Sequence, residues 1–140
     1  MATQQDSHYI GTLTAAGDYN DAADQFTVVR STGTNFTIQT TLDGVCMGVL
    51  QDRPSSGTPG LIKFMGVTKV RVNTTQSDAI KVWDKLSATT DGGVGMSTGG
   101  IDAYVLGRSL TALAAATTGI IQMLITHQGG GSSATTGNGA

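Results

Sequence analysis

Few side chains in this chain of 140 residues could carry out chemistry, and they are widely separated. The histidines, His8 and His127, each lie beside an end that we expect to be flexible, where a general base would lack rigid surroundings. The single cysteine, Cys46, falls within an apolar run, which favours a small buried hydrophobic residue over a reactive thiol. We therefore expect no catalytic residue.

Three aspartates could together hold a cation, since calcium sites use carboxylates at close spacing. Asp18, Asp21 and Asp24 are three residues apart, but they lack the glycine and the terminal glutamate of an EF-hand loop. A solvated, turn-forming loop is the favoured interpretation. One cysteine excludes an internal disulfide and a multi-cysteine zinc site, so we expect no metal and no cofactor.

Trp83 fits a purely structural interpretation least well. Residues 80–86 alternate as a strand would, and this parity places Trp83 with Lys81 and Lys85 rather than with the apolar side. The indole either folds over the rim of a sheet or anchors a contact with another subunit. Both alternatives stay open, because tryptophan is enriched at interfaces but strand parity fails at every bulge.

The composition limits the classes of fold and partner. All ten acidic residues are aspartates, and glycine contributes 20 residues, which makes long helices unfavourable. A net charge of −2 with scattered basic residues gives no footprint for nucleic acid. No apolar run approaches the length of a membrane span, and the first residues lack the pattern of a secretory signal. We expect a soluble protein made in the cytoplasm, with neither nucleic acid nor membrane as a partner.

Short runs of β-branched and apolar residues bounded by glycine, proline or aspartate predict an all-β protein. These runs lie at 9–13, 25–30, 35–39, 45–51, 61–72, 80–86, 103–110 and 120–125. The chain is predicted to comprise an N-terminal arm (1–8), a single β domain (9–127) and a disordered tail rich in glycine, serine and threonine (128–140).

Several finer features of these runs can be checked against a structure. Residues 67–72 alternate as in a half-exposed strand after a break at Gly66, whereas 120–125 is apolar on both sides and is predicted to be a central strand buried on both faces. Asp91-Gly-Gly93 predicts a hairpin turn, and Pro59-Gly60 suits a type II turn. Residues 110–116 have helical propensity for at most two turns.

The order of several pieces resembles the head decoration, or cement, proteins of tailed bacteriophages. The pieces are Asp43-Gly-Val-Cys-Met-Gly-Val-Leu50, Ile62-Lys-Phe-Met-Gly-Val-Thr-Lys-Val70, Val82-Trp-Asp-Lys-Leu86 before an aspartate–glycine turn, Tyr104-Val-Leu-Gly-Arg108 and Gly119-Ile-Ile-Gln-Met-Leu-Ile125. The resemblance covers roughly residues 9 to 127.

This resemblance implies a small domain of the β-barrel or β-tulip type that forms a homotrimer at three-fold positions of the mature capsid. Its partners would be the major capsid protein and its own copies, and its location the outer capsid surface of the virion. No residue would be catalytic. The expected capsid contacts are in the arm, by strand addition to a capsid sheet edge: Gln5, Ser7, His8, Tyr9 and Ile10.

Two other classes stay open. A β-sandwich module that binds a receptor or a carbohydrate would share this composition, but it should carry a cluster of aromatic residues on one face, and the chain has only seven aromatics. An enzyme is the weakest alternative, because no arrangement of residues forms a site.

Overall fold

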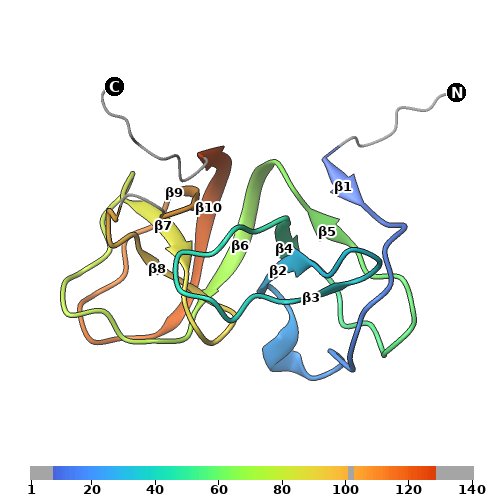
Figure 1. The fold of residues 1–140 in the computed structure, drawn as a ribbon. Coiled ribbons are helices and arrows are strands. Elements are labelled where there is room, and N and C mark those ends of the chain that lie inside the picture. Colours follow the sequence, from blue (N-terminus) through green and yellow to red (C-terminus); the bar gives the residue numbers. More distant parts are fainter. Residues whose placement is uncertain (1–7, 101–102, 129–140) are drawn as a thin grey trace, which may run out of the picture.

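The computed structural model describes residues 8–100 and 103–128. This part of the chain is all-β, as predicted, with ten strands in two antiparallel five-stranded sheets that lie side by side (Figure 1). Its only helical segment is the single 3₁₀ turn η1 (Ala22–Asp24). No helix within the described ranges is long and apolar enough to cross a membrane.

The first sheet, called sheet I, contains the first five strands in the spatial order β1-β5-β4-β2-β3. Its strands are β1 (Tyr9–Ile10), β2 (Val28–Ser31), β3 (Phe36–Ile38), β4 (Gly48–Leu50) and β5 (Ile62–Lys63). All are shorter than the apolar runs in the sequence. Phe26, for example, has a positive φ of 68°, so the predicted strand 25–30 begins only at Val28.

The second sheet, called sheet II, contains the remaining strands in the order β6-β10-β9-β7-β8. Its strands are β6 (Gly66–Val72), β7 (Lys85–Ala88), β8 (Val94–Met96), β9 (Val105–Ser109) and β10 (Gly119–Gln128). The turn predicted at Asp91-Gly-Gly93 does connect the β7–β8 hairpin. The predicted alternation of β6 is also confirmed, because Thr68, Val70 and Val72 are buried.

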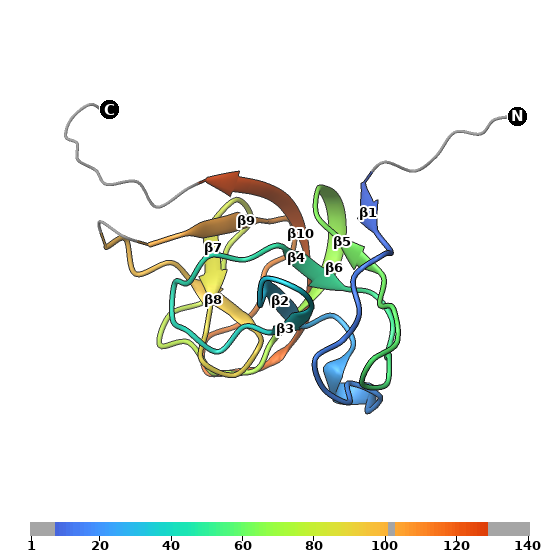
Figure 2. The ribbon, with the colours of Figure 1, turned by 45° about the vertical axis from the view of Figure 1, so that its right-hand side comes forward.

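Sheet I is covered on both faces. Val28 and Val49 pack into a hydrophobic cluster with residues of sheet II, while their neighbours Val29 and Leu50 pack into a second cluster on the other face. Strands β2 and β4 are therefore the ones buried on both sides. Figure 2 shows them between sheet II and the loops that follow β1.

The prediction that 120–125 is buried on both faces is wrong. β10 is central in its sheet, but only Ile121, Met123 and Ile125 face the core. Ile120 on the opposite face is 45% exposed. On this face Val67 of the neighbouring strand is also exposed and Leu124 is partly exposed, so aliphatic side chains remain on the surface.

Three local predictions are also wrong. Residues 80–84 form a turn rather than a strand, because the Asp84 carboxylate accepts a hydrogen bond from the Lys81 amide at 2.7 Å. Residues 110–116 contain no helix, and Ala116 has a positive φ of 60°. In the loop before β5 the positive φ lies at Gly57 rather than at Gly60, so no type II turn is centred there.

Two strand glycines are required by close approach of a neighbouring strand. A Cβ atom at Gly48 would lie 2.1 Å from the Lys63 carbonyl oxygen, and one at Gly107 would lie 2.2 Å from the Leu124 carbonyl oxygen. Real Cβ atoms are not found so close to backbone, so a side chain at either position would push the paired strands apart.

Candidate binding surface

Only some of the residues predicted to contact the capsid belong to the part of the chain that the structure describes. Gln5 and Ser7 lie outside the described residues, as do residues 129–140 of the predicted tail. Gln128, the first residue of that predicted tail, is the last residue of β10. His8, Tyr9 and Ile10 are described, and they bring the chain into sheet I.

Tyr9 and Ile10 form the edge strand β1. They pair with Lys63 and Ile62 of β5, and the His8 carbonyl accepts a hydrogen bond from the Phe64 amide at 2.9 Å. The Lys63 ammonium lies 4.9 Å from the centre of the Tyr9 ring and donates a hydrogen bond to its hydroxyl at 3.3 Å. Tyr9 and Ile10 therefore already pair with β5 of the same chain. The outer edge of β1 pairs with no other strand of the described residues.

Trp83 lies at the tip of the turn before β7, with a positive φ of 80° and 53% of its surface exposed. This segment is a turn and not a strand, but Trp83 does lie beside Lys85, as the alternation of the sequence indicated. The turn is nevertheless well fixed: the Trp83 amide donates to the Ser109 carbonyl at 2.6 Å, and the Ser109 amide donates to the Asp84 carbonyl at 3.0 Å. A bulky side chain in the left-handed region is uncommon and marks a strained position.

The turn places the indole beside an outward-facing row of side chains that crosses sheet II. Val67 of β6 is opposite Leu124 of β10, Leu124 is opposite Arg108 of β9, and Arg108 is opposite Lys85 of β7. Residues directly opposite in antiparallel strands project from the same face. We call these four side chains together with Trp83 the Trp83 face.

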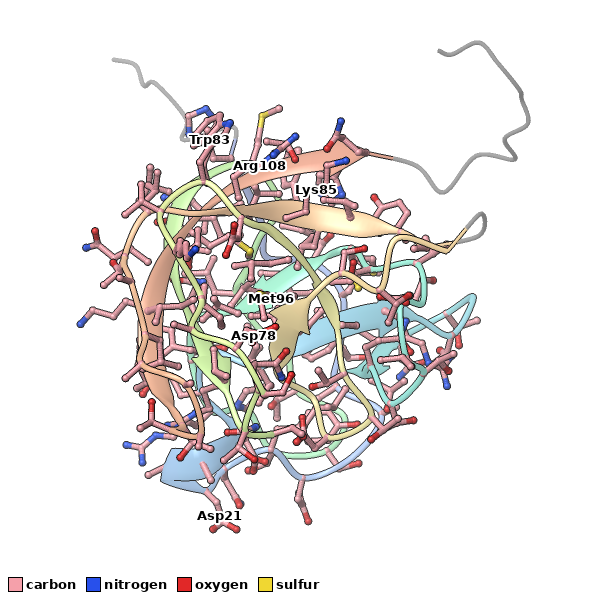
Figure 3. The ribbon with its side chains drawn as sticks, turned by 90° about the vertical axis from the view of Figure 1, so that its left-hand side faces the viewer. Asp21, Asp78, Trp83, Lys85, Met96 and Arg108 are labelled. Atoms are coloured by element: carbon pink, nitrogen blue, oxygen red, sulfur yellow. The ribbon has the colours of Figure 1, made fainter. Side chains whose placement is uncertain are left out.

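Arg108 links the row to the indole. Its guanidinium carbon lies 5.7 Å from the centre of the Trp83 ring, within the range of a cation–π contact, and its Nη1 donates to the Trp83 carbonyl at 3.1 Å. Figure 3 shows Trp83, Arg108 and Lys85 together at one end of the molecule, with Asp21 at the opposite end.

A shallow hollow of about 310 Å³ opens beside this group. It is lined by Trp83, Asp84, Lys85, Met96, Ser97 and Arg108. Asp84 is the only carboxylate in the lining, and one of its oxygens already accepts the Lys81 amide. The hollow therefore presents two cations, one carboxylate, one aromatic ring, one hydroxyl and a thioether, so its formal charge is positive.

A larger hollow of about 400 Å³ lies against sheet I and includes Cys46 in its lining. Cys46 is 4% exposed, and burial raises the pKa of its thiol to about 12, although a hydrogen bond with Gln39 acts in the opposite direction. The thiol donates to the Gly44 carbonyl at 3.1 Å. The predicted burial of Cys46 is confirmed, and a thiol with this pKa stays protonated at neutral pH.

The His127 side chain is held by more contacts than the sequence predicted. It belongs to β10, its Nδ1 lies 2.5 Å from the Tyr104 hydroxyl, and its Nε2 lies 2.6 Å from the Phe64 carbonyl oxygen. Burial, followed by the proximity of Cys46, raises the pKa of Tyr104. Both ring nitrogens of His127 thus fasten the end of β10 to neighbouring loops.

The aspartates near η1 form a turn, as the sequence analysis favoured. The Asp24 carboxylate accepts the Asp21 amide at 3.2 Å, and Asp18 accepts the Ser56 amide at 2.8 Å. Within the described ranges no group of three histidine, cysteine, aspartate or glutamate side chains is arranged to hold a metal ion.

Sequence reasoning placed Trp83 with Lys85 but missed the other side chains beside them, Arg108, Leu124 and Val67. Lys85 and Arg108 are 23 residues apart in sequence, and only the pairing of β7 with β9 brings them together. The half-exposed alternation of β6 was the one available signal for Val67. A comparison with known protein families found no match, and no curated protein matches the chain.

Proposed function

We propose that this chain is a structural, non-enzymatic virion protein that decorates and stabilises the mature capsid of a tailed bacteriophage. Its partners are the major capsid protein and two further copies of itself, arranged as a homotrimer at three-fold positions on the outer capsid surface. It is made in the host cytoplasm. We further propose that the two sheets together form a small domain of the β-barrel or β-tulip type, which their shared hydrophobic cluster supports.

The observation that carries the proposal is the position of β1. Tyr9 and Ile10 form the outermost strand of sheet I, and they follow directly on the residues predicted to be the arm. An edge strand presents unpaired main-chain groups to another chain. A strand of the capsid protein can therefore add to the outer side of β1, with residues 1–7 extending the same contact.

The surroundings of the nucleophilic and basic side chains support a structural role. The raised pKa of Cys46 removes the thiolate that a nucleophile needs. The two nitrogens of His127 are engaged by Tyr104 and Phe64, as a histidine that braces a strand would be. These residues contribute to the fold rather than to a reaction.

A trimer can bind the capsid stably even if each edge contact is weak. When one subunit of a trimer is bound, the other two contacts form at high effective concentration, so occupancy can be high although each contact is small. Loss of one capsomer would then require several linked contacts to break together.

The alternative, a module that binds a receptor or a carbohydrate, has less support. It calls for a cluster of aromatic side chains on one face. Among the described residues Trp83 is the one aromatic side chain with more than half of its surface exposed, and Tyr9 is engaged by Lys63.

The test uses expanded heads that lack the protein. They are mixed with the full-length chain, with a chain lacking residues 1–7 or with one lacking residues 129–140, then sedimented and heated. We expect the full-length chain to co-sediment and to raise the temperature at which heads rupture, the first truncation to bind more weakly, and the second to behave as the full-length chain. Absence of the full-length chain from the head pellet would refute the proposal. Equal binding by the chain lacking residues 1–7 would refute only the role of the arm.

The oligomeric state is measured separately by sedimentation equilibrium. We expect the mass of a trimer, free in solution or after release from heads. A monomer under both conditions would contradict the trimeric arrangement.

A further inference from the structure

We propose that the Trp83 face is a second docking surface, which binds an acidic segment of a partner protein that also carries an apolar side chain. The inference rests on the proposed function, under which this partner is the capsid protein. It differs from the contact at β1, which lies in the other sheet.

The cations on this face have no anionic partner within the described residues. Lys85 and Arg108 are directly opposite each other across β7 and β9, and no described carboxylate forms an ion pair with either. Like charges in this position destabilise a sheet. A carboxylate placed between them would remove that repulsion, and a guanidinium can bind one through two parallel hydrogen bonds.

The turn that carries the indole is already fixed. The Trp83 amide donates a hydrogen bond to the Ser109 carbonyl and the Trp83 carbonyl accepts one from Arg108, so the backbone of Trp83 has little conformational freedom left to lose on binding. Its backbone adopts a strained conformation at φ 80°, which the surrounding contacts maintain. Tryptophan and arginine side by side are the residues most enriched where binding energy concentrates.

The aliphatic half of the row continues from the cations toward the edge strand β6. Val67 is 46% exposed, and its cross-strand neighbour Leu124 is partly exposed. A partner segment that lies along the row would meet two cations at one end and two aliphatic side chains at the other. This sequence of contacts defines the partner as acidic at one point and apolar a few residues away.

A second copy of this chain fits the surface poorly. The loop that contains Asp21 lies at the opposite end of the molecule from Trp83 (Figure 3), so a contact between these two ends would stack copies along a line rather than close three of them into a ring. A symmetric contact that brings several Trp83 faces together would bring their lysines and arginines together as well, which costs free energy.

The experiment compares two charge reversals in binding to expanded heads. Lys85→Glu changes the Trp83 face, while Arg53→Glu makes the same change in charge at an exposed loop residue of the other half of the chain. We expect Lys85→Glu to weaken binding about tenfold and Arg53→Glu to change it less than about twofold. Raising the salt concentration should weaken binding of the wild type more than binding of Lys85→Glu.

Replacement of the anchor gives a second measurement. Trp83→Gly removes the indole and suits the positive φ, so the turn is retained and binding should weaken by at least about tenfold. Val45→Ala, at a side chain 69% exposed in a loop beside sheet I, is the matched control and should leave binding unchanged.

The outcomes separate this inference from the proposed function. If the wild type binds heads and both Lys85→Glu and Trp83→Gly bind equally well, the inference is wrong while the proposed function stands. If either variant instead changes the mass of the free trimer, the face is a subunit contact and the inference is also wrong. If the wild type itself fails to bind heads, both proposals fall.

Discussion

Replacement of Gly107 by alanine should destabilise the protein far more than the same replacement at Gly119. A Cβ atom at position 107 would lie 2.2 Å from the Leu124 carbonyl oxygen and 2.8 Å from the Met123 Cγ atom. At position 119 the nearest atom, the Leu113 Cδ1 atom, is 3.6 Å away, which is an ordinary contact. Both residues belong to sheet II, so the pair isolates the effect of close strand approach.

The expected loss of stability can be worked out from the strand displacement that the added methyl group requires. To admit the methyl group, β10 must shift by about 1 Å from β9, which costs roughly 1–3 kcal/mol in overpacking and weakens about two ladder hydrogen bonds worth about 1 kcal/mol each. We expect a loss of about 3–5 kcal/mol in the free energy of unfolding. With an unfolding entropy of about 0.3 kcal/mol/K for 140 residues, this lowers the melting temperature by about 10–17 °C.

The assay is thermal unfolding of the wild type, Gly107→Ala and Gly119→Ala, followed by circular dichroism at one protein concentration. The control should melt within about 3 °C of the wild type, since a tolerated methyl group changes stability by less than about 1 kcal/mol. Equal melting temperatures for the two variants would show that β9 and β10 do not approach as closely as described.

Four further outcomes are expected. Lys85→Glu should raise the free energy of unfolding, measured in urea, by about 0.2–1 kcal/mol, because an opposite-charge pair with Arg108 replaces a like-charge pair. A lower free energy of unfolding would contradict the register of β7 and β9. Cys46, with its pKa raised from 9.0 to about 12, should react with iodoacetamide at pH 8 about a thousandfold more slowly than a free thiol, and mass spectrometry that finds rapid labelling of the folded protein would contradict its burial. Because this pKa is higher in the folded state, the stability that the protonated thiol contributes is complete below pH 9.0 and declines from there to about pH 12, so the wild type should lose stability relative to Cys46→Ala over that range. Burial tends to raise the pKa of Asp91, but hydrogen bonds from Thr74, Thr89 and the Gly93 amide outweigh this effect and leave the pKa below 3.8. Asp91→Asn should therefore be less stable than the wild type at pH 7, and the difference in the free energy of unfolding, measured in urea, should narrow as the pH falls below 3.8. A difference that stays constant with pH would contradict these hydrogen bonds.

The fold class could be predicted because it depends on local patterns. The alternation of β6 and the aspartate–glycine turn before β8 are each contained in a few residues, and both are confirmed. The burial of β10 could not be predicted in this way. Six residues with apolar side chains on both sides indicate a strand, but whether Ile120 is covered depends on what packs against the sheet from elsewhere in the chain.

The candidate binding surface could be predicted from the sequence even less well than the burial of β10. The alternation of residues 80–86 was misleading because the Asp84 side chain closes a turn on the Lys81 amide, an interaction that a pattern of apolar positions does not reveal. The row beside Trp83 depends on the register of three strand pairs, and a shift of one residue in any of them would send its members to the opposite face.

The double burial of β2 and β4 has a consequence for how the molecule responds to force. Val28 and Val29, like Val49 and Leu50, are neighbours in sequence that belong to different hydrophobic clusters. Neither cluster can loosen without exposing side chains of the other, so the two halves should unfold in a single cooperative step, with the slowest amide exchange in these two strands. A pull applied to the edge strand β1 passes through β5 to β4 and is thereby shared between both clusters. The chain is thus mechanically one unit from its outermost strand to its centre.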